Sequence, residues 1–250
     1  MVIYKYVLLG MLPMLIYLAV TQTLSVEDCP TGYNGPGGIS EQSAHYSCTG
    51  GANRYVDSQV LGPDHYYQTP TCMDVYECES YDPEGIMGGF SAAFLAVCGL
   101  FVGRFVSVYG MHPAVVIRRL VGSGVLLCAA AAGLCGTSEN SGVMPVNKNL
   151  WSPSFVLLCA GFANLLFAAL YYVVDVRHKW DGWPLRETGM NSIVLYMGHE
   201  ILGAYMPLSV YFTLESQSKH WGLLLSNVIG VTVCVGVAHW LHGKKIYISV

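Results

Sequence analysis

Charged side chains are scarce in this sequence. Lys, Arg, Asp and Glu make up 11% of its 250 residues, against about 25% in soluble domains. No run of Lys or Arg occurs, and the net charge is -4, so the basic surface that nucleic-acid binding requires is missing. The sequence also has no Asn-x-Ser/Thr sequon, no Gly-rich phosphate loop and no Gly-x-Ser-x-Gly motif. These absences argue against nucleic-acid binding and nucleotide hydrolysis, and the low charge indicates a membrane protein.

Long apolar runs take the place of the missing charge. Hydrophobic residues account for 53% of the chain, and the mean hydropathy is +0.45. A helix needs about 20 apolar residues to cross the roughly 30 Å of hydrocarbon in a bilayer. The sequence therefore predicts one all-α, polytopic membrane domain over residues 1–250, with six spans: Ile3–Val20, Ile86–Val108, Val115–Gly136, Pro153–Val174, Met190–Phe212 and Trp221–Leu241. A signal peptide is the alternative for the first run, although no A-x-A-like cleavage site follows it.

The cations are distributed unequally between the two sides of such a bundle. Lys and Arg gather in cytosolic connections. The side with both chain ends holds nine of them: Lys5, Arg104, Arg118, Arg119, Arg177, Lys179, Arg186, Lys244 and Lys245. The opposite side holds three: Arg54, Lys148 and Lys219. Both ends are therefore predicted to be cytosolic, and the long 26–84 loop luminal or exoplasmic.

The 26–84 loop contains four cysteines, Cys29, Cys48, Cys72 and Cys78. Disulfides persist only in oxidising compartments, which agrees with the predicted orientation. Four cysteines allow three pairings, and the spacing alone leaves them open. The spacing from Cys72 to Cys78 does not fit a zinc knuckle, so no metal site is expected. Interleaved glycines, prolines and tyrosines predict a compact layer rather than a linker.

The pair His199-Glu200 lies near the middle of the apolar segment Met190–Phe212. Ionisable side chains at that depth are costly and therefore indicate a functional site. On a helix, His199 continues a row that begins at Asn191, and Glu200 continues the next row from Ser192. This pattern predicts a polar stripe that faces the bundle interior. The competing interpretation is that these groups only join helices by hydrogen bonds.

Two more groups on the predicted luminal side are candidates for a site. Glu84 ends the loop, directly after Asp82 and Pro83, which are expected to cap and begin the second span. Asn147, Lys148, Asn149 and Trp151 stand in the connection between the third and fourth spans, where Lys148 is the only cation and a candidate ion-pair partner for Glu84 or Glu139. Simple capping and an ordinary interfacial loop are the alternatives.

Taken together, these motifs resemble one family. The strings CPTGYNGPGG, CTGGANRYVD, DHYYQ, YDPEG, VNKNLWS, GMNSIVLYMGHE and the GKKIY tail are similar to the C-terminal half of the heparan-alpha-glucosaminide N-acetyltransferases. The resemblance implies a lysosomal multi-pass enzyme. Such an enzyme transfers acetyl from cytosolic acetyl-CoA, a co-substrate rather than a tightly bound cofactor, to the terminal glucosamine of luminal heparan sulfate. It also suggests that Cys72 and Cys78, which lack counterparts in close relatives, pair with each other.

The resemblance further implies that part of the enzyme lies outside this chain. Family members carry additional upstream helices, including a catalytic histidine that none of the eight histidines here matches. The chain alone is therefore expected to be inactive. The implied partners are those N-terminal helices, the lipid bilayer and, as an open alternative, a second copy of the chain. Glu84 and His199 are expected to handle or orient a proton. A substrate or cofactor pocket is expected to involve Asn147, Lys148, Asn191 and Glu200.

Two other functions remain open at the level of sequence. A non-catalytic membrane scaffold would keep the fold without the chemistry. A transporter-like subunit would use His199 and Glu200 for the passage of ions or protons.

The charge count generates a prediction that does not depend on the family. A single cysteine placed at Lys148 should resist a membrane-impermeant thiol reagent added from the cytosolic side, whereas one at Lys244 should react. Labelling at position 148 together with protection at position 244 would reverse the orientation.

Overall fold

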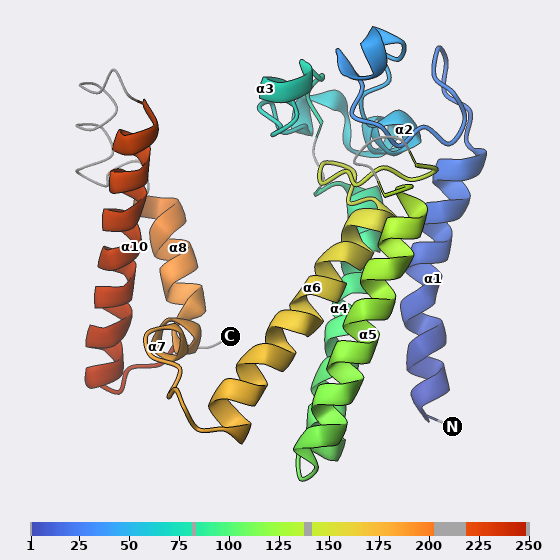
Figure 1. The fold of residues 1–250 in the computed structure, drawn as a ribbon. Coiled ribbons are helices and arrows are strands. Elements are labelled where there is room, and N and C mark those ends of the chain that lie inside the picture. The colour runs from blue at the N-terminus through green and yellow to red at the C-terminus, as the bar shows by residue number, and fades with distance from the viewer. Residues whose placement is uncertain (1, 82–83, 138–141, 203–218, 249–250) are drawn as a thin grey trace. The chain divides into compact units, whose positions relative to one another are not determined.

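The computed structural model describes residues 2–81, 84–137, 142–202 and 219–248. These residues form helices and turns without a regular strand, apart from one isolated bridge between Val26 and Cys29. They divide into two compact units, Met1–Tyr172 and Val173–Val250 (Figure 1). The predicted all-helical class is confirmed for the described part of the chain.

Four long helices make up the first unit: α1 (Val2–Thr23), α4 (Ile86–Tyr109), α5 (Pro113–Leu134) and α6 (Pro153–Tyr171). A π-helical turn, η3 (Tyr172–Val176), continues α6. Among the described residues, three helices are long and apolar enough to cross a membrane: Ile86–Tyr109, Pro113–Leu134 and Pro153–Val176. They match the predicted second, third and fourth spans.

The other predicted spans are only partly supported. Shorter apolar helices occur at Gly10–Thr23 and Asn227–Gly243, where the first and last spans were expected. The predicted span Met190–Phe212 lies outside the described residues beyond Leu202. The total of six spans therefore stays a prediction.

Small residues let the helices of the first unit approach closely. A Cβ atom on Gly161 would lie 2.5 Å from Cys128 Sγ, and one on Gly124 would lie 2.8 Å from Leu165 Cγ. These contacts bring α5 and α6 together, as small residues do between membrane helices. Asn164 Nδ2 also donates to Ser123 Oγ at 3.0 Å, across the same pair of helices. On the other side, Met14, Tyr17, Met87 and Val156 form a buried cluster among α1, α4 and α6.

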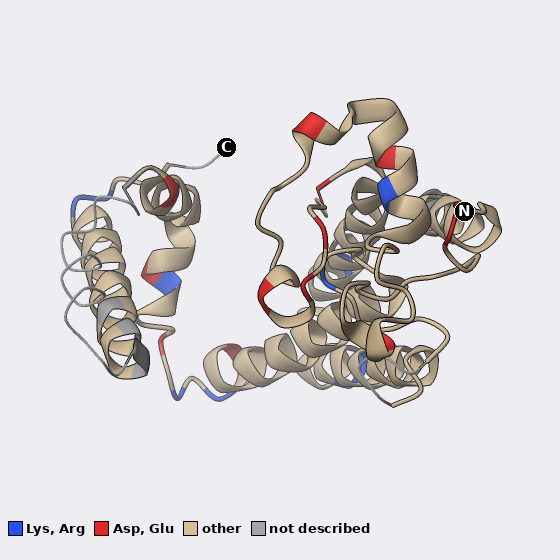
Figure 2. Ribbon diagram, turned by 90° about the horizontal axis from the view of Figure 1, so that it is seen from above, with Lys and Arg blue, Asp and Glu red and all other residues tan. Residues whose placement is uncertain are grey.

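Residues 24–81 fold over one end of these helices, and we call this region the cap layer (Figure 1). It contains η1 (Ser40–Ser43), α2 (Gly51–Leu61), η2 (Pro63–His65) and α3 (Met73–Tyr76). Two disulfides close it, Cys29–Cys48 and Cys72–Cys78. The second is the pairing that the family resemblance suggested. Figure 2 shows acidic positions along the layer. Between positions 26 and 81 the sequence has eight Asp and Glu residues and a single Lys or Arg, which is Arg54.

A buried carboxylate joins the cap layer to α4. Asp57 of α2 is 1% exposed; its Oδ1 accepts from the Met87 backbone N–H at 3.3 Å, and its Oδ2 accepts from the Tyr81 hydroxyl at 3.3 Å. Burial and the neighbouring carboxylate raise the pKa of Tyr81 well above its usual range, so the phenol keeps the proton that it donates. A Cβ on Gly85 would lie 2.2 Å from Asp57 Oδ2, so only glycine allows this approach.

The helix α4 begins where the second span was expected to begin, and its first turn is contacted by a residue from α2. The helix begins at Ile86 with Gly85 as its N-cap residue, which provides no side-chain cap. Asp82 and Pro83, the predicted cap and first-turn residues, lie outside the described residues. A carboxylate on the first turn is supplied by Asp57, 30 residues before Met87 in the chain.

The second unit contains α7 (Leu185–Met190), α8 (Ser192–Leu202) and α10 (Lys219–Gly243). Glu187 of α7 is 4% exposed. Its Oε2 lies 2.8 Å from His239 Nδ1, and its Oε1 lies 3.9 Å from His242 Nε2, both on α10. A buried carboxylate requires such partners, so this contact holds α7 against α10.

Removing the Asp57 carboxylate should destabilise the first unit. Asp57→Ala leaves the Met87 N–H and the Tyr81 hydroxyl without their acceptor, which costs about 1–3 kcal/mol. The thermal unfolding midpoint of detergent-purified protein should fall, whereas Asp64→Ala, in the exposed η2 turn, should leave it unchanged. Equal midpoints for the two variants would contradict the role of Asp57.

The equivalent experiment on the second unit targets Glu187. Glu187→Ala should expose the junction of α7 and α10 to limited proteolysis, because the two histidines lose their buried partner. Glu200→Ala is the matched control, since Glu200 forms an exposed pair of little energetic value. Equal proteolysis of both variants would show that Glu187 does not hold the helices together.

Candidate functional site

The segment between α5 and α6 is anchored at a point where three parts of the first unit meet. The Tyr17 hydroxyl of α1 donates to the Leu150 carbonyl at 3.0 Å, and it accepts from Asn53 Nδ2 of α2 at 2.7 Å. All three groups are buried. One hydroxyl therefore connects α1, the cap layer and the residues around Leu150.

Side-chain hydrogen bonds define the conformation of the turn that precedes α6. Ser152 Oγ donates to the Pro145 carbonyl at 2.8 Å and accepts from the Asn147 backbone N–H at 3.0 Å. Asn147 Oδ1 accepts from the Asn149 backbone N–H at 3.0 Å, and its Nδ2 donates to the Asn34 carbonyl at 3.3 Å. The amide of Asn147 thus organises the turn and attaches it to the cap layer.

A pocket of about 250 Å³ lies between this turn and the cap layer. It is lined by Pro36, Thr71, Cys72, Val75, Tyr76, Val146, Asn147, Lys148 and Asn149. The structure therefore places Asn147 and Lys148, both predicted to line a pocket, at one pocket. The Cys72–Cys78 disulfide ties down the opposing segment. The exposed Lys148 has no ion pair with any described residue, and Glu139, one suggested partner, is not among them.

Asn149, which the sequence placed in this candidate group without assigning it to the pocket, has an unusual environment. It is 7% exposed, and its Oδ1 accepts from the Thr71 hydroxyl at 2.9 Å. Its Nδ2 is buried without a hydrogen-bond partner. Such groups are rare in folded proteins and often mark functional positions. The sequence signal was only its place beside Lys148.

Glu84 stands apart from this pocket. It is exposed, lies two residues before α4, and is not among the lining residues. Its predicted role in proton handling stays a prediction.

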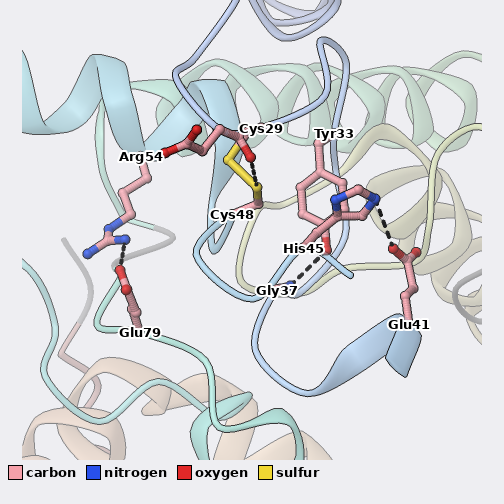
Figure 3. The surroundings of a disulfide bond; sticks show 9 residues. Cys29, Tyr33, Gly37, Glu41, His45, Cys48, Arg54 and Glu79 are labelled. Carbon is pink, nitrogen blue, oxygen red and sulfur yellow. Dashed lines mark hydrogen bonds and ion pairs between the residues drawn. A yellow bond between two sulfur atoms is a disulfide. The ribbon is translucent and has the colours of Figure 1, made fainter. Parts of the chain in front are cut away.

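A second hollow, of about 320 Å³, surrounds the Cys29–Cys48 disulfide. Glu27, Asp28 and Arg54 are among the residues that line it. Figure 3 shows Arg54 paired with Glu79, and Tyr33 beside His45, with ring centroids 5.1 Å apart. Burial raises the pKa of Tyr33, whose hydroxyl accepts from the Gly37 N–H at 2.9 Å. The pairing of Arg54 leaves no unpaired cation among the residues that line this hollow.

The second unit places its predicted site residues in two different environments. Asn191 is fully buried at the end of α7; its Nδ2 donates to the Ile246 carbonyl and its Oδ1 accepts from the Ile248 N–H, both at 3.2 Å. It clamps the C-terminal tail. His199 and Glu200 have side chains that are 69% and 60% exposed, and they lie 3.8 Å from each other. Within the described part of this unit they do not face the interior, and they contact each other.

The predicted site residues therefore fall into separate groups. Asn147 and Lys148 share a pocket in the first unit, whereas Asn191, His199 and Glu200 belong to the second. The hypothesis that they form one wall stays a prediction. Among the described residues no group of three or more His, Cys, Asp or Glu side chains is suited to hold a metal ion.

Comparison with known proteins supports the family resemblance. No family model matches the chain. The chain is 39% identical over 233 residues to the human heparan-alpha-glucosaminide N-acetyltransferase, and 38% identical over 233 residues to the mouse protein of the same name. Each match covers 93% of this chain and 35% of the relative, so the chain spans about a third of the length of these relatives. Over nearly its whole length, the chain is thus similar to part of heparan-alpha-glucosaminide N-acetyltransferase, as its motifs predicted.

Proposed function

We propose that this chain forms part of a lysosomal membrane N-acetyltransferase. In this proposal, acetyl passes from cytosolic acetyl-CoA to the terminal glucosamine of luminal heparan sulfate. The observation that carries the proposal is the 39% identity over 93% of the chain to an enzyme of that name. The membrane-capable helices and the disulfide-closed cap layer support it.

The proposed reaction has its two substrates on opposite sides of a membrane. With the C-terminal tail in the cytosol and the cap layer in the lumen, α4, α5 and α6 cross between the two compartments. The glycan then meets the cap layer and the turn around Lys148. Acetyl-CoA enters from the side that carries most of the cations, where its phosphates find Arg and Lys partners.

The chemistry requires a base and a donor for the developing negative charge. The glucosamine amine must lose a proton to the base before its nitrogen attacks the thioester carbon, and the tetrahedral oxyanion needs hydrogen-bond donors. Collapse of this intermediate breaks the C–S bond and releases the coenzyme A thiolate, which takes up a proton. We assign the main base to a histidine on helices upstream of this chain. Glu84 of the first unit and His199 of the second act as supporting groups that handle or orient a proton, and Glu200 beside His199 contributes to substrate or cofactor binding.

Activity measurements test this function directly. Residues 1–250 alone should not transfer acetyl from acetyl-CoA to a glucosamine acceptor, whereas co-expression with the histidine-bearing upstream helices should restore turnover. Turnover by the chain alone would place the base within it, with His199 as the leading candidate. Correctly folded protein that stays inactive with those helices would favour the scaffold, and proton flux in vesicles without acetyl transfer would favour the transporter.

The supporting groups are tested within the active assembly. Glu84→Gln and His199→Asn should each lower turnover per folded molecule by roughly a hundredfold or more if they handle a proton. Glu27→Gln, elsewhere in the acidic cap layer, is the matched control. Unchanged turnover in both variants would return Glu84 and His199 to purely structural roles.

A further inference from the structure

We propose that the pocket between the cap layer and the Lys148 turn binds an anionic group of the glycan, a carboxylate or a sulfate on the sugar next to the terminal amino sugar. The identity of the glycan rests on the function proposed above. The anionic character of the ligand rests on the pocket itself, through two donors that have no acceptor among the described residues, Asn149 Nδ2 and Lys148 Nζ.

The first donor is the buried amide of Asn149. Asn149 is among the residues that line the pocket, and its Nδ2 is buried without a hydrogen-bond partner among the described residues. Leaving a buried donor without an acceptor costs about 1–3 kcal/mol. Thr71 holds the other end of the amide through Oδ1, which keeps the N–H groups directed away from that bond. A ligand with an acceptor oxygen at this point would satisfy the amide.

The second donor is the ammonium of Lys148. It is exposed at the pocket and forms no ion pair with a described residue. No carboxylate is among the lining residues. A pocket lined by an ammonium and no carboxylate favours an anion, since hydrogen bonds in which a partner is ionised are about twice as strong as neutral ones.

Lys148 lies next to a cap layer that is rich in acidic residues, so its positive charge sets the pocket apart from its surroundings. Eight acidic residues and one arginine lie between positions 26 and 81, and that arginine is paired with Glu79. The cap layer therefore favours a cation such as an ammonium group, whereas the Lys148 pocket favours an anion. A glycan that ends in an amino sugar followed by an anionic sugar carries both charges, in a fixed order.

The size and shape of the pocket suit one sugar residue. Its volume of about 250 Å³ is below the roughly 300–1,000 Å³ of sites for drug-sized ligands. Tyr76, Pro36 and Val75 supply apolar surface for the face of a sugar ring. The Cys72–Cys78 disulfide and the hydrogen bonds of Asn147 hold the two sides in place before the ligand arrives. Such preorganisation lowers the entropic cost of binding.

Binding calorimetry on the detergent-purified chain tests the inference without acetyl transfer. The probes are an O-sulfated glucosamine–glucuronate disaccharide, its carboxyl-reduced form and its desulfated form. We expect the parent disaccharide to bind, and removal of one of the two anionic groups to weaken binding about tenfold or more. The form that loses affinity identifies the carboxylate or the sulfate as the anchor.

Variants locate the binding site. Lys148→Met should weaken binding of the parent disaccharide about tenfold or more, and Asn149→Asp should do the same because it keeps the acceptor for Thr71 but adds a negative charge. Lys244→Met, in the tail of the second unit, is the matched control. Equal affinity for all three disaccharides, or unchanged affinity in Lys148→Met, would overturn the inference. The comparison of probes uses wild-type protein, so it does not depend on the folding of any variant.

The two proposals fail in different ways. Anion-dependent binding without acetyl transfer by the completed enzyme would reject the proposed function and keep the pocket assignment. Acetyl transfer with an unchanged KM for the disaccharide in Lys148→Met would keep the function and reject the pocket assignment.

Discussion

The buried hydroxyl of Tyr17 is the contact on which the first unit depends. It accepts from Asn53 and donates to the Leu150 carbonyl, so one atom relates α1, the cap layer and the turn before α6. A buried hydroxyl without hydrogen-bond partners would destabilise the fold. The Asn53 amide and the Leu150 carbonyl provide these partners, so the three segments stabilise one another. The position of Asn149 follows, because it is the residue next to Leu150. The geometry of the pocket is thus set by a hydrogen bond that lies outside it.

Charge is arranged in the same unit with a clear division. The acidic residues of the cap layer are numerous, and their burial is limited to places such as Asp57, where α4 supplies an N–H and Tyr81 a hydroxyl. The single Arg54 is neutralised by Glu79. Lys148 then remains the cation that is available to a ligand on this side of the described first unit. Such a division matters for a charged substrate, because like charges repel and opposite charges guide its orientation.

In the second unit, some polar residues are used in hydrogen bonds within the protein, whereas others remain exposed and able to bind a ligand. Asn191 spends both ends of its amide on the backbone of the C-terminal tail, and Glu187 is enclosed by the histidines of α10. His199 and Glu200 contact each other while remaining largely exposed. Groups that the fold already satisfies have little capacity for a ligand, whereas exposed ones keep theirs. Asn191 therefore has a structural role in the described second unit, whereas His199 and Glu200, which the sequence predicted to share a polar stripe with it, remain accessible to a ligand.

The sequence by itself determined the helical membrane class, three of the spans and the family resemblance, because apolar runs and long motifs are local properties. It predicted Asn147 and Lys148 as pocket residues, since a lone cation between spans is visible in the chain, and both line one hollow of the folded first unit. Tertiary structure decided which polar groups have hydrogen-bond partners within the protein. Asp57 reaches the first turn of α4 from 30 residues away, Glu187 finds its partner 52 residues later, and Asn149 is left with an unsatisfied N–H. No periodicity records such contacts, because hydrogen-bond satisfaction depends on neighbours that only the folded chain brings together.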